Sequence, residues 1–291
     1  MKNRQVGVTL IELMISLVFG MLLIAGVSSL FLQMQKINRS QRAVNNMTDD
    51  ASYSQEMLQK EIRRAGGLRS KLDNNGIASK VFTDEGVIEV PGTGISLDLN
   101  AQDYVKGDSS EHPDNDAFVI RYQLLDADDL SSGNSSNNSS PWTVNSLLDM
   151  GEDPAEQAHV IRVYFFVNNG SLRCTSQRSV AGACNTGVGK NCALADAPVT
   201  LIDNVQKLTV LYGVDADADH AANYYVNAAS VEAANVWKNV TSMQLSLVLK
   251  SEDTHLVQQV QPYTVEGAAI TPSDHSLYRL FFTTIALRNQ L

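Results

Sequence analysis

The sequence predicts an α+β protein in which a long N-terminal helix packs on an antiparallel β-sheet. Three features predict this class: an uncharged apolar run from Leu13 to Gln35, a helical periodicity that continues beyond it, and strand-like segments after Gly67. A helix followed by many strands is typical of such folds, because the sheet needs a cover for one face. The chain of 291 residues leaves well over half its length for a β-rich domain over residues 66–291.

The apolar run is long enough to cross a membrane. At about 1.5 Å per residue, about 20 helical residues span a bilayer core of about 30 Å, so residues 13–35 are predicted to be transmembrane. A cleaved secretory signal would have a shorter apolar core and a small-residue cleavage site after it. The residues from Lys36 to Arg39 offer no such site. The plausible cleavage point is Gly7-Val8, which removes leader residues 1–7 and retains the helix.

The helix is predicted to continue without a break to Ala65. Beyond Gln35, apolar residues recur at intervals of three, four and seven, the pattern of an amphipathic helix. They are Ile37, Val44, Met47, Ala51, Leu58, Ile62 and Ala65. Gly66-Gly67 is a natural stop, because glycine accepts the left-handed conformation that often ends a helix. The predicted helix therefore covers residues 8–65.

Strand-like segments fill most of the remaining chain. They are Ala117–Tyr122, His159–Val167, Ser171–Cys174, Val205–Tyr212, Met243–Leu249 and Tyr278–Leu287. Asn168-Asn169-Gly170 predicts a hairpin between the second and third of these segments. The polar stretch Ser131–Ser140 has too few apolar side chains to order itself, so it is predicted to be a surface loop.

Composition and motifs favour a structural protein over an enzyme or a nucleic-acid-binding protein. The formal net charge is −10 at pH 7, whereas a nucleic-acid groove needs clustered Lys and Arg. The sequence contains no nucleophile elbow, phosphate-binding loop or metalloprotease motif. We therefore expect no catalytic residues and no cofactor, apart from the calcium candidate described below.

Three cysteines are crowded into one polar stretch. Cys174, Cys184 and Cys192 fit neither a zinc-binding nor a C-x-x-C spacing. In an oxidising compartment the simplest interpretation is one disulfide that closes a small loop. One cysteine is then left over, and the spacing does not decide which pair forms.

An acidic turn follows one predicted strand. Asp215, Asp217 and Asp219 occupy alternate positions, like the start of a calcium loop. However, His220 stands where the sharp-turn glycine belongs, and Val226 where the bidentate glutamate belongs. The three carboxylates form either a weak calcium site or a solvated acidic turn, and the two missing positions favour the turn.

The start of the chain resembles the prepilin-peptidase signature of type IV pilins and pseudopilins. The matching residues are Gly7-Val8-Thr9-Leu10-Ile11-Glu12-Leu13, with Val8 where the family usually has Phe. The resemblance implies cleavage after Gly7 and methylation of the new N-terminus. It also implies that Thr9 and Glu12 are assembly residues and that Glu12 contacts the N-terminal amine of a neighbouring subunit. The alternative is a glutamate that merely lies at headgroup level.

The C-terminal part resembles the PilW family of minor pilins. The resemblance rests on Tyr212–Asp215 with its Asp repeat, Trp237–Val240, the strand that ends at Leu249, Arg279, and Thr283–Asn289. The family usually has glycine at the position of His220, which puts a calcium role in doubt.

The two resemblances imply a minor pilin that helps to initiate or cap a type IV pilus in a tip complex, with other minor pilins and the major pilin as partners. The helix would cross the inner membrane once, with the C-terminal domain in the periplasm before assembly. The alternatives are a GspJ-like pseudopilin of a type II secretion system and a membrane-anchored periplasmic enzyme. An adhesive role at the tip, or a role in twitching motility, is compatible with the minor pilin.

Overall fold

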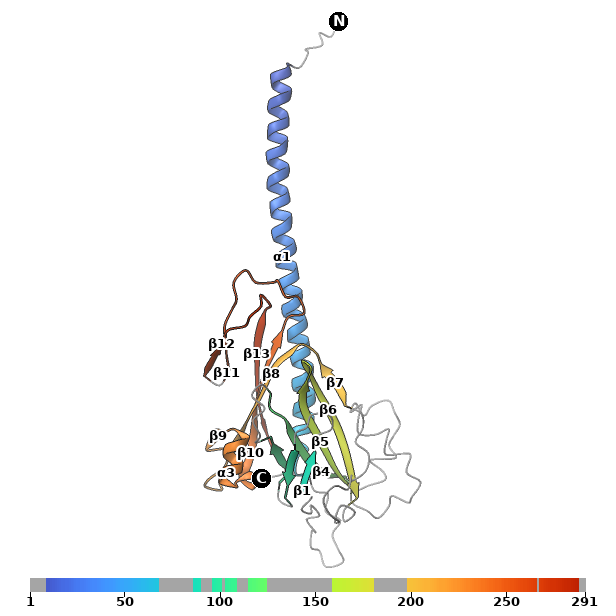
Figure 1. Cartoon of the computed structure of the whole chain (residues 1–291), viewed down its shortest axis with the longest axis vertical. Coiled ribbons are helices and arrows are strands. Elements are labelled where there is room, and N and C mark those ends of the chain that lie inside the picture. Colours follow the sequence, from blue (N-terminus) through green and yellow to red (C-terminus); the bar gives the residue numbers. More distant parts are fainter. Residues whose placement is uncertain are drawn as a thin grey trace, which may run out of the picture.

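A long helix projects from a β-rich domain in the computed structural model of the chain (Figure 1). The structure describes residues 9–67, 86–89, 96–100, 103–108, 115–124, 159–180, 198–265 and 267–287. The predicted cleavage residues Gly7 and Val8, the predicted loop Ser131–Ser140, and Cys184 and Cys192 lie outside the described residues.

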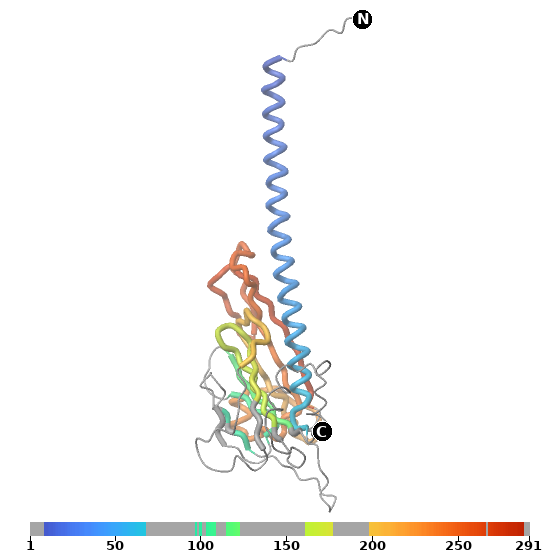
Figure 2. The backbone as a smooth tube through the Cα atoms, turned by 90° about the vertical axis from the view of Figure 1, so that its right-hand side faces the viewer, coloured from blue at the N-terminus to red at the C-terminus, as the bar shows by residue number. Residues whose placement is uncertain are grey.

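Helix α1 (Leu10–Ile62) is 53 residues long and extends well beyond the β domain (Figure 2). A turn follows its last residue, and Gly66 adopts a positive φ of 71°. The Gly66 N–H donates to the carbonyl of Arg121 at 2.9 Å, in strand β4 (Phe118–Leu124). The helix thus ends at Ile62, three residues before the predicted end, and Gly66 ends the turn that follows and attaches it to the sheet.

The described strands form two larger antiparallel sheets. The five-stranded sheet has the order β3-β4-β5-β6-β7. Besides β4, it contains β3 (Val105–Gly107), β5 (His159–Asn168), β6 (Ser171–Val180) and β7 (Val199–Ile202). Asn169 and Gly170 join β5 to β6 with φ values of 51° and 73°. This left-handed pair suits the twist of a two-residue hairpin, so the predicted hairpin is confirmed.

The second sheet has four strands in the order β13-β10-β8-β9. They are β8 (Val205–Val214), β9 (Tyr224–Val226), β10 (Val240–Lys250) and β13 (Tyr278–Ala286). Between β9 and β10 the chain forms the short helix α3 (Ala228–Ala234) and the 3-10 turn η2 (Trp237–Asn239). Two separate hairpins pair β1 (Gly86–Glu89) with β2 (Ser96–Leu99), and β11 (Tyr263–Val265) with β12 (Ala268–Ile270).

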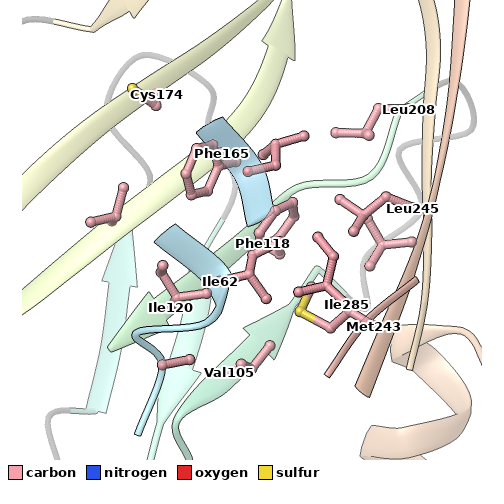
Figure 3. Close-up of a cluster of buried hydrophobic side chains, with 14 of the residues drawn as sticks. Ile62, Val105, Phe118, Ile120, Phe165, Cys174, Leu208, Met243, Leu245 and Ile285 are labelled. Carbon is pink, nitrogen blue, oxygen red and sulfur yellow. The ribbon is translucent and has the colours of Figure 1, made fainter. Parts of the chain in front are cut away.

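The main core lies between the C-terminal half of α1 and the inner faces of both sheets. Ile62 of α1 lies beside Phe118 and Ile120 of β4 (Figure 3). Phe118 stacks on Phe165 of β5, with ring centroids 5.1 Å apart. Met243, Leu245 and other alternate residues of β10 face the same core, because side chains alternate between the two faces of a strand. One hydrophobic cluster thus joins the helix to both sheets.

A buried lysine links the five-stranded sheet to α3. Lys106 of β3 is 4% exposed, and its Nζ lies 2.7 Å from the Glu232 carboxylate and 5.3 Å from the centre of the Trp237 ring. Partial burial opposes ionisation of Glu232, but hydrogen bonds from Lys106 and Trp237 outweigh it and lower the pKa of this carboxyl. A Cβ on Gly107 would lie only 2.1 Å from the Tyr212 hydroxyl. The close approach of β3 to β8 therefore requires glycine at this position.

Candidate functional site

The N-terminal half of α1 is an exposed apolar surface. From Leu10 to Ile37, its large hydrophobic side chains are 51–78% exposed. Among the described helices, α1 alone is long and apolar enough to cross a membrane. A helix that is apolar on all sides is stable only in lipid or among other apolar helices. This half of α1 is therefore the candidate surface for membrane anchoring and for association with other helices.

Thr9 and Glu12 lie together at the start of this surface. Thr9 is the N-cap, and its carbonyl accepts from the N–H of Leu13 at 3.2 Å, but its side chain makes no capping hydrogen bond. Glu12 lies in the first helical turn and is exposed. The positive end of the helix dipole favours a carboxylate there. Within the described part of the chain, the Glu12 carboxylate has no ion-pair partner, so it is available to a cation from outside this chain.

The C-terminal half of α1 has the opposite environment. Glu61 is fully buried, with an oxygen 3.2 Å from the Arg64 guanidinium. Burial, and then the nearby Glu61 carboxylate, raise the pKa of Tyr122 and raise that of the Cys174 thiol to about 12. Sequence reasoning missed Glu61 as a buried group. The signal was its place three residues after Leu58 and four before Ala65, on the apolar face of the helix.

Cys174 is the described member of the cysteine group. It lies on β6 as a buried free thiol, in the same core cluster as Ile62 (Figure 3). A thiol enclosed by apolar side chains resists ionisation and is therefore unreactive. The predicted disulfide stays a prediction, because Cys184 and Cys192 lie outside the described residues.

The acidic turn brings its three aspartates together, as their spacing suggests. Carboxylate oxygens of Asp215, Asp217 and Asp219 lie within 4.8 Å of one another. Asp215 is 7% exposed and accepts from the backbone N–H groups of Asp217, Ala218 and His220 at 3.2, 2.7 and 2.9 Å. Burial of Asp215 opposes its ionisation, but these three hydrogen bonds outweigh burial and lower its pKa. Asp215 therefore organises the turn whether or not a cation binds.

The two departures from a calcium loop have different consequences in the structure. His220 adopts a positive φ of 68°, so the left-handed conformation expected of glycine is present without glycine. Val226 belongs to β9 and supplies no carboxylate. Asp217 and Asp219 are exposed. The turn thus offers three carboxylates at one end and no bidentate ligand from position 226.

A family model described as Type IV Pilus-assembly protein W matches residues 164–289. The match runs from within β5 to beyond β13 and includes the acidic turn, Trp237 and the last strand. The resemblance to the PilW family is therefore confirmed over these residues. No curated protein matches the chain.

Two solved structures are similar to the chain at low sequence identity. A type IV-like pilin from Thermus thermophilus has 14% identity and a TM-score of 0.40, and the match covers 84% of this chain and 96% of that one. The GspK-GspI-GspJ complex of the enterotoxigenic Escherichia coli type 2 secretion system contains a chain with 9% identity and a TM-score of 0.28, with the same two coverages. Neither likeness identifies a function by itself.

Proposed function

We propose that the chain is a minor pilin that helps to initiate or cap type IV pilus assembly within a tip complex. The match of residues 164–289 to the PilW family carries this proposal. The uncovered apolar half of α1 supports it, because such a surface requires lipid or neighbouring helices. The role is structural rather than enzymatic, and the partners are other minor pilins and the major pilin.

The proposed sequence of events starts in the inner membrane. Prepilin peptidase cuts between Gly7 and Val8, the new N-terminus is methylated, and the β domain lies in the periplasm. The helix then leaves the bilayer by packing against other pilin helices. Packing between apolar helices replaces lipid contacts at a modest net cost, so this transfer requires no large change in the domain.

An ion pair made by Glu12 would favour movement of the helix from the bilayer into the pilus. An acidic residue costs about 2.5–3.5 kcal/mol at the centre of a membrane helix, and Glu12, at the edge of the predicted span, would meet this cost only if it were drawn into the apolar layer. The free amine at the N-terminus of a neighbouring subunit would neutralise this carboxylate during assembly. The proposed role of Glu12 is therefore an intermolecular ion pair, with Thr9 in the same turn at the contact.

Replacing Glu12 tests the assembly role. Glu12→Ala and Glu12→Gln are expected to reduce the number of pili sharply, while the chain stays folded and in the membrane fraction. Glu56→Gln is the matched control, because Glu56 is an exposed glutamate on the same helix. Unchanged piliation in both Glu12 variants would contradict the proposal.

Two further measurements test cleavage by prepilin peptidase and the choice between a type IV pilus and a type II secretion system. Mass spectrometry of the mature chain is expected to find an N-methylated peptide that begins at Val8. A mature chain that retains Met1 would contradict peptidase processing.

The GspJ-like alternative has the same kind of N-terminal helix, so a deletion phenotype is needed to distinguish it from the minor pilin. A deletion that abolishes protein secretion and leaves pili intact would favour the pseudopilin.

A further inference from the structure

A cleft of about 630 Å³ lies where α1 leaves the β domain. Arg39, Arg42 and Asp50 line its helical wall. The opposite wall consists of Lys250 at the end of β10 and the residues after it, Ser251–Asp253. The helical residues fall on one face, because they are separated by three and eight positions. The cleft thus has one wall from the helix and one from the β domain.

Apart from half-buried Asp50 on the helix and ion-paired Lys250 on the other wall, the charged residues of the two walls are opposite in sign. Arg39 and Arg42 lie on the helix, and Glu252 and Asp253 lie on the facing segment; all four are exposed. Within the described residues, none of these four side chains takes part in an ion pair. Lys250 differs, because its Nζ lies 2.6 Å from the Asp274 carboxylate. The cleft therefore suits a ligand that carries an anionic group and a cationic group together.

The cleft begins at the height of the lipid headgroups when residues 13–35 span the bilayer. With a rise of about 1.5 Å per residue, Arg39 lies about 6 Å beyond Gln35 and Arg42 about 10 Å beyond it. The headgroup layer on each side of a bilayer is about 5–8 Å thick. Long arginine side chains reach back toward such a layer. Asp50 lies about 12 Å further along the helix than Arg42 and is outside this layer.

We propose that the cleft binds the headgroup of a phospholipid that has both a phosphate and a primary ammonium, namely phosphatidylethanolamine. Arg39 and Arg42 bind the phosphate, and Glu252 and Asp253 accept hydrogen bonds from the ammonium. Guanidinium groups suit phosphate because they donate two parallel hydrogen bonds. A primary ammonium has three donors, whereas the quaternary ammonium of phosphatidylcholine has none. The inference rests on the membrane-anchored state in the proposed function.

Lipid binding can be measured on the purified full chain in detergent by native mass spectrometry. The probes are phosphatidylethanolamine, phosphatidylcholine and phosphatidylglycerol with identical acyl chains. We expect several-fold tighter binding of phosphatidylethanolamine than of the other two. The double variant R39Q/R42Q is expected to bind phosphatidylethanolamine about tenfold more weakly, from the loss of charge-assisted hydrogen bonds.

Variants of Glu252 and Asp253 test recognition of the ammonium group separately. E252Q/D253N is expected to lose the preference for phosphatidylethanolamine over phosphatidylcholine while it retains the weaker binding that both lipids share. Glu56→Gln and Lys238→Gln are matched controls, since both residues are exposed charges that do not line the cleft, and they are expected to leave all three affinities unchanged. All variants alter exposed side chains, so equal melting temperatures would show that each chain is folded.

Three results would overturn the inference. Equal affinities for the three lipids would exclude headgroup recognition, and a preference for phosphatidylglycerol would show that the basic wall acts alone. Unchanged lipid binding in R39Q/R42Q, with loss of copurifying pilins, would make the cleft a protein interface. Each result leaves the piliation of the Glu12 variants unaffected, so failure of this inference is distinguishable from failure of the proposed function.

Discussion

The two halves of α1 share one continuous helix but have opposite surroundings. Between Leu10 and Ile37 the large apolar side chains are more than half exposed, whereas Met47, Ala51, Leu58 and Ile62 are at most 4% exposed. The difference follows from the sequence pattern. The first half is apolar on every side, and the second has one apolar face, which packs on the sheets. Secondary structure alone therefore does not decide what a helix contacts.

The two carboxylates at the ends of α1 repeat this contrast. Glu12 is exposed in the apolar half and has no ion-pair partner among the described residues. Glu61 is fully buried in the packed half beside Arg64. A buried charge is tolerated only when it is paired and hydrogen-bonded. Glu61 is therefore committed to the fold, while Glu12 is available for assembly.

Matched leucine substitutions give the largest expected difference between the halves. Leu58→Ala removes a fully packed side chain from the core and is expected to lower the free energy of unfolding by about 2–5 kcal/mol. Leu22→Ala removes an exposed side chain and is expected to change it by less than about 0.5 kcal/mol. Chemical denaturation of the full chain in detergent, followed by fluorescence of buried Trp237, measures both values.

Similar losses in the two leucine variants would contradict the division of the helix. In that case the apolar half would contribute to the folding of the β domain, rather than only to anchoring. A second core variant, Ile62→Val, is expected to cost about 0.5–1.5 kcal/mol. This variant shows whether the loss in free energy of unfolding scales with the side-chain volume removed.

The glutamate pair is expected to show the next largest difference. Glu61→Ala leaves a cavity and removes the carboxylate that pairs with Arg64, so the free energy of unfolding is expected to fall by roughly 1–3 kcal/mol. Glu12→Ala is expected to leave it unchanged. Equal stability of the two variants would remove the proposed contrast between their roles.

The buried thiol predicts a loss of stability at alkaline pH. The pKa of Cys174 rises from 9.0 to about 12, chiefly through burial. The folded state therefore holds a proton that the unfolded state releases above pH 9. Its contribution to stability is complete below pH 9 and is lost as the pH rises from 9 toward 12. At pH 10 the contribution of Cys174 to this loss is expected to be about 1.4 kcal/mol. Urea unfolding measures it as the difference between the unaltered chain and Cys174→Ala, because the raised pKa values of Tyr122 and Tyr212 cause a separate loss at alkaline pH.

Thiol counting supplies the control for this cysteine. A soluble chain that starts near Ala43 is expected to contain one disulfide and one thiol after export, and we propose that Cys184 and Cys192 form the bridge. The single thiol should react only when the protein unfolds. Three reactive thiols would contradict export to an oxidising compartment.

Sequence periodicity predicted the long elements because each buries a regular apolar pattern. Met47, Ala51 and Leu58 recur at helical spacing, and Leu245, Leu247 and Leu249 alternate along β10. Both patterns are properties of the local sequence, so they predict the helix and the strand without knowledge of distant contacts. The assignment of Thr9 and Glu12 as assembly residues rests on the resemblance of residues 7–13 to the prepilin-peptidase signature, and it stays a prediction.

The remaining elements depend on contacts between distant residues. Strand β3 has three residues and includes Lys106, a poor candidate for burial on its own. Asp103, three residues earlier, has a carboxylate oxygen 3.5 Å from the Lys106 Nζ, but the closer carboxylate of Glu232 and the aromatic ring of Trp237 come from more than a hundred residues later. Similarly, the cleft beside Arg39 and Arg42 requires the segment after β10. No local pattern contains such information.

The acidic turn is expected to give the smallest effect, and it belongs to the β domain rather than to either half of α1. Three carboxylates within 4.8 Å repel one another, and a cation would relieve this repulsion. Without a bidentate glutamate, calcium affinity is expected in the 10⁻⁴–10⁻³ M range. At 1 mM calcium, linkage then stabilises the fold by about 0.4–1.4 kcal/mol. Titration calorimetry, with Asp217→Ala and with Asp49→Asn as an exposed control, measures the affinity. Micromolar binding that disappears in Asp217→Ala would make calcium part of how the domain folds.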